Sequence, residues 1–147
     1  MGKWVPTVAP SQVVYTFNVN HTDEGLREIF GDLRFRQAVS HALNREEMNE
    51  LVYFGLGEPA QYTAFEPGTV NFVADEQKAY LTEVDTDKAN GLLDEMGLVD
   101  ADGDGNRDRL NGSALVVNLQ YSSQGAPVQM AETKPSCCIT SNKLHSY

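Results

Sequence analysis

Apolar side chains recur with the period of an α-helix in two neighbouring stretches of the chain. The first stripe has members at i, i+3, i+4, i+7 and i+8 and consists of Phe35, Ala38, Val39, Ala42 and Leu43. The second consists of Met48, Leu51 and Val52. Such spacing gathers the apolar residues on one face of each helix. The pattern predicts two consecutive helices whose apolar faces cover a shared surface, most simply a sheet.

The ends of this helix pair carry capping residues. Asp32 follows Gly31, and its carboxylate can accept hydrogen bonds from the free backbone N–H groups of the first turn. Asn44 separates the two stripes, and Glu47 lies three residues later, which is the spacing of a capping box. Gly55 is placed to end the second helix in the left-handed region.

Alternation of side chains predicts two strands. In the stretch 13–20, Val, Tyr, Phe and Val occupy the odd positions, which are expected to face the core. The stretch 115–121, Leu-Val-Val-Asn-Leu-Gln-Tyr, has the β-branched and aromatic content of a second strand. The residues between 21 and 31 form a polar connection with a short helical turn around Leu26 to Ile29.

A third helix is expected to begin after Asp85. Its apolar stripe consists of Ala89, Leu92, Leu93 and Met96. Gly97 is placed to end it, with Leu98 as the apolar residue that follows the left-handed turn. A short helix is expected at 74–81, a long irregular segment at 57–71, and the start of a fourth helix at 124–132.

These elements predict an α/β fold, with a small mixed sheet covered by helices. The length of 147 residues suits about one domain. Residues 133–147 have no hydrophobic period and differ abruptly in composition from what precedes them. We therefore expect a division into a folded part at 1–132 and a tail at 133–147. The tail is either foreign, from a frameshift or vector read-through, or a native disordered end.

The charge of the chain restricts its partners. A formal net charge of −10 argues against nucleic acid and against an anionic membrane surface, because both bind through Lys and Arg. No apolar run approaches the roughly 18 residues of a membrane span. The N-terminus lacks an apolar signal-peptide core, so the chain is expected to be cytoplasmic or cut from a longer protein. Cys137 and Cys138 are adjacent and predict neither a disulfide framework nor a metal site.

An acidic loop gives the sharpest local signal for chemistry. Oxygen ligands at positions 1, 3, 5 and 9 of a calcium loop correspond to Asp100, Asp102, Asp104 and Asp108, with Gly105 at position 6. Position 12 is Asn111 instead of a bidentate Glu, and a strand follows instead of a helix. A calcium site is therefore one hypothesis. The other is a polar turn in which the Asp side chains accept backbone N–H groups.

The remaining chemical signals are weak. His21, His41 and His145 have no zinc spacing, and His41 lies off the apolar stripe, so it is expected to be solvated. A helix-turn-helix at 32–55 is disfavoured by its one-residue turn and by the glutamates of the second helix. The sequence contains no nucleophile elbow and no phosphate loop. It is therefore not expected to be an enzyme, although an unrecognised small enzyme stays an alternative to a binding module.

Several segments, taken in order, resemble the family 5 extracellular solute-binding proteins of ABC importers, in particular the dipeptide- and oligopeptide-binding branch. The segments that carry the resemblance are Phe17-Asn18, Asp32–Ala38, Ala42–Glu47, Tyr53–Gly55, Gly57–Ala60, Asp85–Ala89 and Leu92–Leu98, followed by the Asp-Gly-Asp-Gly turn. Asn44 stands where many relatives have Asp, and either residue caps a helix. The resemblance covers about residues 13–132.

The resemblance implies a periplasmic or lipid-anchored parent about four times longer, with two lobes that close on a peptide or similar solute for delivery to a permease. This chain would be the first half of the C-terminal lobe of a periplasmic-binding-protein-like fold. The main ligand anchors of the family would lie beyond residue 132, so no ligand-binding residue is assigned and no measurable peptide binding is expected. The acidic loop would be a structural turn. A partial lobe leaves sheet edges uncovered, which predicts a homodimer or a strand-exchanged assembly.

Overall fold

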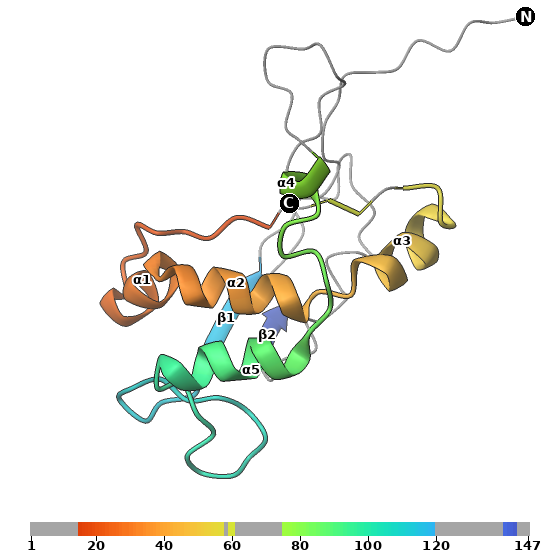
Figure 1. Cartoon of the computed structure of the whole chain (residues 1–147). Helices are drawn as coiled ribbons and strands as arrows, with labels where there is room; N and C mark the ends of the chain where they lie inside the picture. The colour runs from red at the N-terminus through yellow and green to blue at the C-terminus, as the bar shows by residue number, and fades with distance from the viewer. Residues whose placement is uncertain (1–14, 58, 61–74, 120–139, 144–147) are drawn as a thin grey trace, which may run out of the picture.

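The computed structural model describes residues 15–57, 59–60, 75–119 and 140–143 (Figure 1). Helices dominate the described part of the chain. In chain order the elements are α1 (Glu24–Gly31), α2 (Leu33–Ala42), α3 (Arg45–Tyr53), α4 (Asp75–Lys78), α5 (Thr86–Glu95), β1 (Val116–Leu119) and β2 (Thr140–Lys143).

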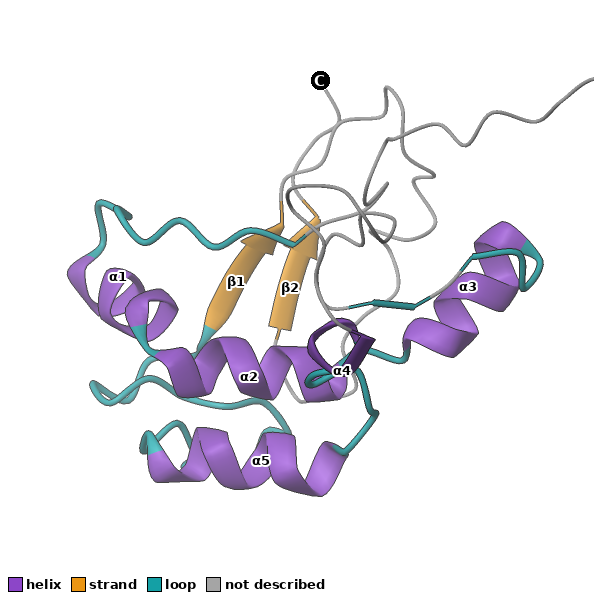
Figure 2. Cartoon of the chain, turned by 45° about the horizontal axis from the view of Figure 1, so that its top comes forward, coloured by secondary structure: helices purple, strands orange, loops and turns teal. Residues whose placement is uncertain are grey.

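Helices α2 and α5 lie side by side and form the centre of the described structure (Figures 1 and 2). Helix α1 packs against α2, whereas α3 extends away from the α2–α5 pair (Figure 2). Strands β1 and β2 form a parallel pair in which Val116 lies opposite Thr140 and Leu119 lies opposite Lys143. No helix among the described residues is long and apolar enough to cross a membrane.

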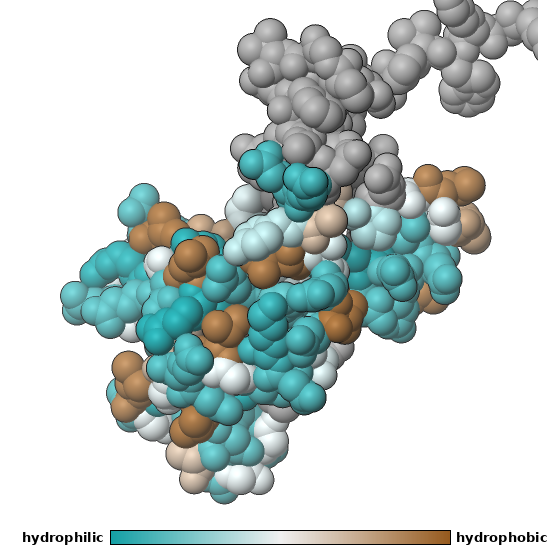
Figure 3. All heavy atoms as spheres, in the orientation of Figure 1, coloured by the Kyte–Doolittle hydropathy of each residue, from teal (hydrophilic) through white to brown (hydrophobic). Residues whose placement is uncertain are grey.

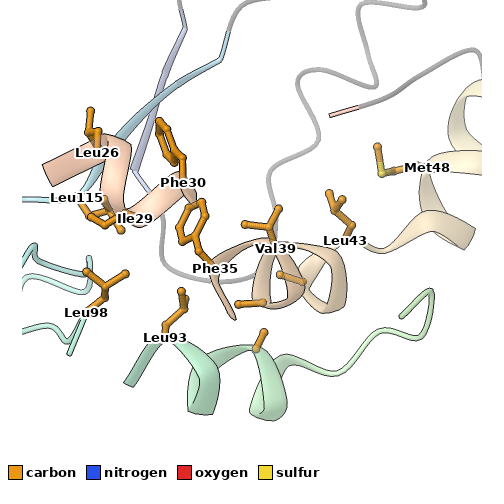
Figure 4. Packing of buried hydrophobic residues seen from close by; sticks show 13 residues of the cluster. Leu26, Ile29, Phe30, Phe35, Val39, Leu43, Met48, Leu93, Leu98 and Leu115 are labelled. Atoms are coloured by element: carbon orange, nitrogen blue, oxygen red, sulfur yellow. The ribbon is translucent and has the colours of Figure 1, made fainter. Parts of the chain in front are cut away.

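The core is built mainly by the predicted stripes of α2 and α5, with a contribution from α1. Phe35, Ala38 and Ala42 of α2 and Ala89 and Leu93 of α5 are fully buried. Figure 4 shows Phe30, Phe35 and Leu93 close together, with Leu98 and Leu115 at one end of the cluster. Met48 lies at the opposite end, on α3. The predicted apolar faces of α2 and α5 are therefore confirmed.

Three aromatic rings form a compact group within this core. The ring centroids of Phe17 and Phe35 lie 5.5 Å apart in an edge-on arrangement, and those of Phe30 and Phe35 lie 5.7 Å apart. Phe35 is completely buried. Edge-on and tilted pairs are favourable geometries for aromatic rings. Phe35 of α2 therefore stabilises the packing of Phe17, from the segment before α1, and of Phe30, from α1.

The predicted helix starts are confirmed by hydrogen bonds. Asp32 accepts from the backbone N–H of Arg34 at 2.8 Å, Asn44 from that of Glu47 at 3.1 Å, and Asp85 from that of Lys88 at 2.9 Å. These bonds satisfy N–H groups that have no partner inside a helix.

The end of α5 follows its prediction. Gly97 has a φ of +76°, and its N–H donates to Asp94 O at 2.9 Å, while the N–H of Leu98 donates to Leu93 O at 3.0 Å. This is the hydrogen-bond pair of a Schellman motif. A Cβ at position 97 would lie 2.7 Å from Cδ2 of the exposed Leu110 side chain, which can move aside, so the left-handed backbone conformation is what favours glycine at this position.

Helix α3 differs from its prediction at its outer end. The left-handed region begins at Phe54, with a φ of 54°, and continues at Gly55. Met48 is buried, but Leu51 is 68% exposed, and Phe54 and Leu56 are more exposed still. Figure 3 shows hydrophobic atoms gathered at this end of α3. The second stripe therefore covers the core through Met48 and the partly buried Val52 only.

The strand predicted at 13–20 is wrong for the described residues 15–20, which belong to no sheet. Tyr15 and Phe17 do pack against the core, as the alternation predicts, but Val19 is 48% exposed. The reason is a turn at Asn18, whose carbonyl accepts from the His21 N–H and whose side chain accepts from the Asn20 N–H. Asn favours such local bonds over a ladder.

Two further differences concern the helix α1 and the direction of the strands. The expected short helical turn near residue 26 is the complete helix α1, capped by Asp23, which accepts from the Leu26 N–H at 3.0 Å. The sheet was expected to be mixed, but the described β1–β2 pair is parallel, and the antiparallel pairing within the described part is one isolated bridge, Asp108 to Ala114. The fourth helix at 124–132 and most of the segment 57–71 lie outside the described residues.

The pKa of Asp32 gives a first testable prediction. The Arg34 side chain, which donates to Asp32 Oδ2 at 2.7 Å, holds this pKa below its ordinary value of 3.8, aided by the Arg34 backbone N–H. A lowered pKa in the folded state means that stability from the charged form is present above pH 3.8 and is lost as the pH falls through the lowered pKa. Asp32→Asn retains a cap but cannot titrate.

We expect the stability difference between the native chain and Asp32→Asn to shrink as the pH falls below 3.8. Urea unfolding at a series of pH values between neutrality and pH 2 measures this difference. Equal pH dependence of the two proteins would show that the Asp32–Arg34 contact does not favour the folded state.

Candidate functional site

The acidic loop between α5 and β1 is the candidate site indicated by the sequence. Backbone hydrogen bonds close the loop at its base, because the Asp108 N–H donates to Val99 O and the Leu115 N–H donates to Arg107 O, each at 2.8 Å. The loop is therefore anchored to the end of α5 on one side and to the entry of β1 on the other.

The Asp side chains of the loop accept backbone N–H groups. Asp100 accepts from Gly103 at 2.7 Å and from Gly105 at 2.9 Å, through its two carboxylate oxygens. Asp102 and Asp104 each accept from the N–H two residues later, and Asp108 accepts from the Ala101 N–H at 3.0 Å. These are the bonds of the polar turn that the sequence offered as the alternative to calcium.

Three of the four predicted calcium ligands do come together. One carboxylate oxygen from each of Asp100, Asp102 and Asp108 lies within 4.8 Å of the others, with Asp108 buried and the other two exposed. Asp104 is not in this group. Calcium takes six to eight oxygen ligands, and several oxygens of the loop already accept N–H groups.

Arg107 anchors the loop to α5, and the sequence did not indicate it. Its side chain is almost completely buried. Nη1 donates to Leu98 O and, at 2.6 Å, to Asp94 Oδ1, while Nη2 donates to Asn90 Oδ1 at 3.0 Å. A planar guanidinium can serve all three acceptors at once. The available signal was an Arg placed directly before Asp108 in a loop rich in Asp.

A second polar cluster joins the end of α2 to the segment before α5. The Ser40 hydroxyl donates to Leu81 O at 2.9 Å, and Arg45 Nη1 donates to Ser40 O at 2.8 Å. The Asp85 N–H donates to His41 O at 3.0 Å. Burial lowers the pKa of Arg45. The cluster fixes where the chain returns to the core after α3.

The prediction that His41 is solvated is wrong. Its side chain is fully buried, with Nδ1 3.3 Å from Glu83 O. The residue lies off the apolar stripe, but the segment 81–85 returns to the helix and covers it. The helical pattern alone does not reveal this cover. His21 lies near the surface, with its Nδ1 accepting from the Asp23 N–H at 3.0 Å, and its ring lies edge-on to that of Phe30.

Comparison with known proteins decides the family. The family model described as bacterial extracellular solute-binding proteins, family 5 middle, matches residues 2–133. This chain belongs to that family. The resemblance seen in the sequence is therefore confirmed, and the family comprises binding proteins, in agreement with the expectation that the chain is not an enzyme.

Two solved structures of oligopeptide-binding proteins are similar to the chain. One, an oligopeptide-binding protein OppA, has 36% sequence identity and a TM-score of 0.74 over 88% of this chain and 21% of its own. The other, the oligopeptide-binding protein AppA from Bacillus subtilis in complex with a nonapeptide, has 25% identity and a TM-score of 0.66 over 87% of this chain and 25% of its own. The comparison with curated proteins gave no match. The chain thus spans about a fifth to a quarter of the lengths of these relatives.

Proposed function

We propose that this family 5 chain is part of the substrate-binding component of an ABC importer that captures peptides outside the membrane and delivers them to a permease. The observation that carries the proposal is the 36% identity with an oligopeptide-binding protein over 88% of the chain. A second support is the AppA structure, which holds a nonapeptide. Within the whole protein, the segment described here supplies framework and not chemistry.

The packing of the described residues supports this framework role. The α2–α5 core is closed by a cap at each predicted helix start, and the acidic loop satisfies its own carboxylates. We place the segment in the first half of the C-terminal lobe of the parent. The description of the matching family model as the middle part supports an internal position.

A chimera tests the proposed function. Residues 2–133 would replace the matched segment of OppA, and peptide binding would be measured by isothermal titration calorimetry. If the chain is a family 5 segment with the proposed role, the chimera binds oligopeptides with an affinity near that of the parent. A chimera carrying Phe35→Asp is the control for a disrupted core. A chimera that folds, shown by a cooperative thermal transition, but binds no peptide would contradict the proposal.

The chain by itself is expected to bind no peptide measurably. It spans about a fifth of OppA, and a peptide enclosed between two lobes draws most of its contacts from parts absent here. Titration of the isolated chain with the same peptides used for the chimera checks this expectation. Binding by the isolated chain at micromolar affinity would place ligand residues within 1–147.

Calcium binding by the acidic loop is the second candidate function, favoured by the grouping of Asp100, Asp102 and Asp108 oxygens within 4.8 Å. Against it, the Asp100 carboxylate already accepts two backbone N–H groups. Because a ligand that binds the folded state raises its stability, calcium at 100 times its Kd would add about 2.7 kcal/mol. Thermal unfolding with and without millimolar calcium tests whether the loop binds the ion. An unchanged Tm removes the candidate, and a rise that disappears in Asp102→Asn supports it.

A further inference from the structure

Strand β2 lies beside β1 although it comes from outside the part of the chain that matches the family. The family model ends at residue 133, whereas β2 spans Thr140–Lys143. The two strands pair in parallel through four consecutive residues. We propose that β2 is an edge cap, which keeps the edge of β1 that it covers from pairing with the same edge in a second copy of the chain.

The sequence around β1 needs such protection. The stretch 115–121 has seven residues without charge, proline or glycine, and Val, Leu and Tyr occupy five of them. Six- or seven-residue windows of this composition pair readily with identical segments. An uncovered edge offers a row of free N–H and C=O groups as the template for that pairing. Asn118 is the exposed residue of the strand.

The sequence of β2 has the features of a protective edge strand. It is four residues long and reads Thr-Ser-Asn-Lys, so it lacks large apolar side chains. Lys143 lies opposite Leu119 at the end of the pair. Short length and a Lys are two of the devices by which natural sheets prevent edge-to-edge association. On the side of β1 that β2 covers, the edge of the sheet is now β2 itself. This short polar strand is a poor template for pairing with another chain.

The partner that β2 excludes is a second copy of the chain. Without β2, every molecule would expose the same edge of β1, so two copies could pair with each other. Isologous pairing of two β1 strands is antiparallel and needs no connecting segment. This inference concerns the chain itself and does not rest on peptide binding. The homodimer expected from the sequence stays a prediction. Variants of β2 make it possible to measure how the cap changes self-association.

Two prolines in β2 test the proposal. Because the bonds to one neighbour come from alternate residues of a strand, Ser141→Pro with Asn142→Pro removes a donor whichever set faces β1. We expect this variant to associate at about tenfold lower concentration than the native chain, as its uncovered edge pairs with that of another copy. Sedimentation velocity and thioflavin T fluorescence measure the association. Lys143→Gln, which leaves the backbone unchanged, is expected to give a smaller shift in the same direction.

A charge on β1 separates edge pairing from general unfolding. Asn118→Lys places a like charge in every exposed β1, so it should return the double-proline variant to the association of the native chain. Prolines at 145 and 146, which follow β2 in the sequence, form the matched control and should leave the association unchanged. The proposal is overturned if neither β2 variant associates more than the native chain. It is also overturned if Asn118→Lys fails to suppress the association of the double-proline variant.

Discussion

Phe35→Ala is expected to lower the free energy of unfolding more than any other single truncation in the described core. The side chain is completely buried and joins two other aromatic rings at centroid distances of 5.5 and 5.7 Å. Removing a buried Phe costs about 3–5 kcal/mol through lost transfer energy and the cavity that remains. Small domains have a total stability of about 5–15 kcal/mol, so the loss is a large part of the whole. The helices that Phe35 connects would separate first.

Urea unfolding followed by circular dichroism measures this effect. Leu33→Ala is the matched control, because Leu33 belongs to the same helix but is 58% exposed. Its cost should stay within about 0.5 kcal/mol, as for most surface substitutions. Comparable losses in the two variants would mean that the aromatic group is not the centre of the core.

The second large effect is expected for Arg107→Met. The substitution retains much of the buried aliphatic volume but removes the donors to Leu98 O and Asn90 Oδ1. Buried acceptors without a partner, together with the broken pair to Asp94, are expected to cost about 2–3 kcal/mol. The Asp94 carboxylate contributes the smaller share, because it is 59% exposed and solvent screens it. The acidic loop should loosen from α5 as a consequence.

Thermal unfolding and amide exchange at the loop measure the consequence together. Arg34→Met is the control, since Arg34 also pairs with an Asp but is 44% exposed, and its cost should stay below about 1 kcal/mol. Arg107→Lys keeps the charge without the planar fork and should fall between the two. Equal stability of Arg107→Met and Arg34→Met would contradict the anchoring role.

Much of the helical framework could be predicted because its determinants are local. The caps at Asp32, Asn44 and Asp85 and the left-handed Gly97 depend on residues within one helical turn, and all four are observed. Periodicity also identified the buried faces of α2 and α5. The packing of α2 on α5 was not predicted, because periodicity shows which face of a helix is buried but not which element covers that face.

Most of the failures involve contacts between segments distant in the chain. Leu51 belongs to a helical stripe, but α3 extends away from the core and leaves it exposed. His41 is buried because the segment near Glu83 returns over α2. Residues 15–20 have strand-like alternation, yet the turn at Asn18 prevails over it. Strand β2 gave no signal, since four polar residues carry neither a period nor an apolar face.

The sequence predicted which residues form the candidate site but not what their carboxylate oxygens bind. The spacing of the Asp residues correctly indicated a tight loop with several carboxylates at its centre. It could not decide whether those oxygens serve a metal ion or the backbone, because both need the same residue types at the same short intervals. Asp104 shows the distinction, as it bonds the Asn106 N–H and takes no place in the group of three.

The polar cluster at Ser40, His41 and Arg45 has a consequence for how relatives of this chain can diverge. The Ser40 hydroxyl and His41 O fasten the end of α2 to Leu81 and Asp85, so the two ends of the intervening segment 44–80 are held together. Doubling the length of a closed loop costs only about 0.6 kcal/mol. Insertions and deletions among family 5 proteins should therefore accumulate in the part of this segment that follows α3, where they leave the register of α2 on α5 unchanged.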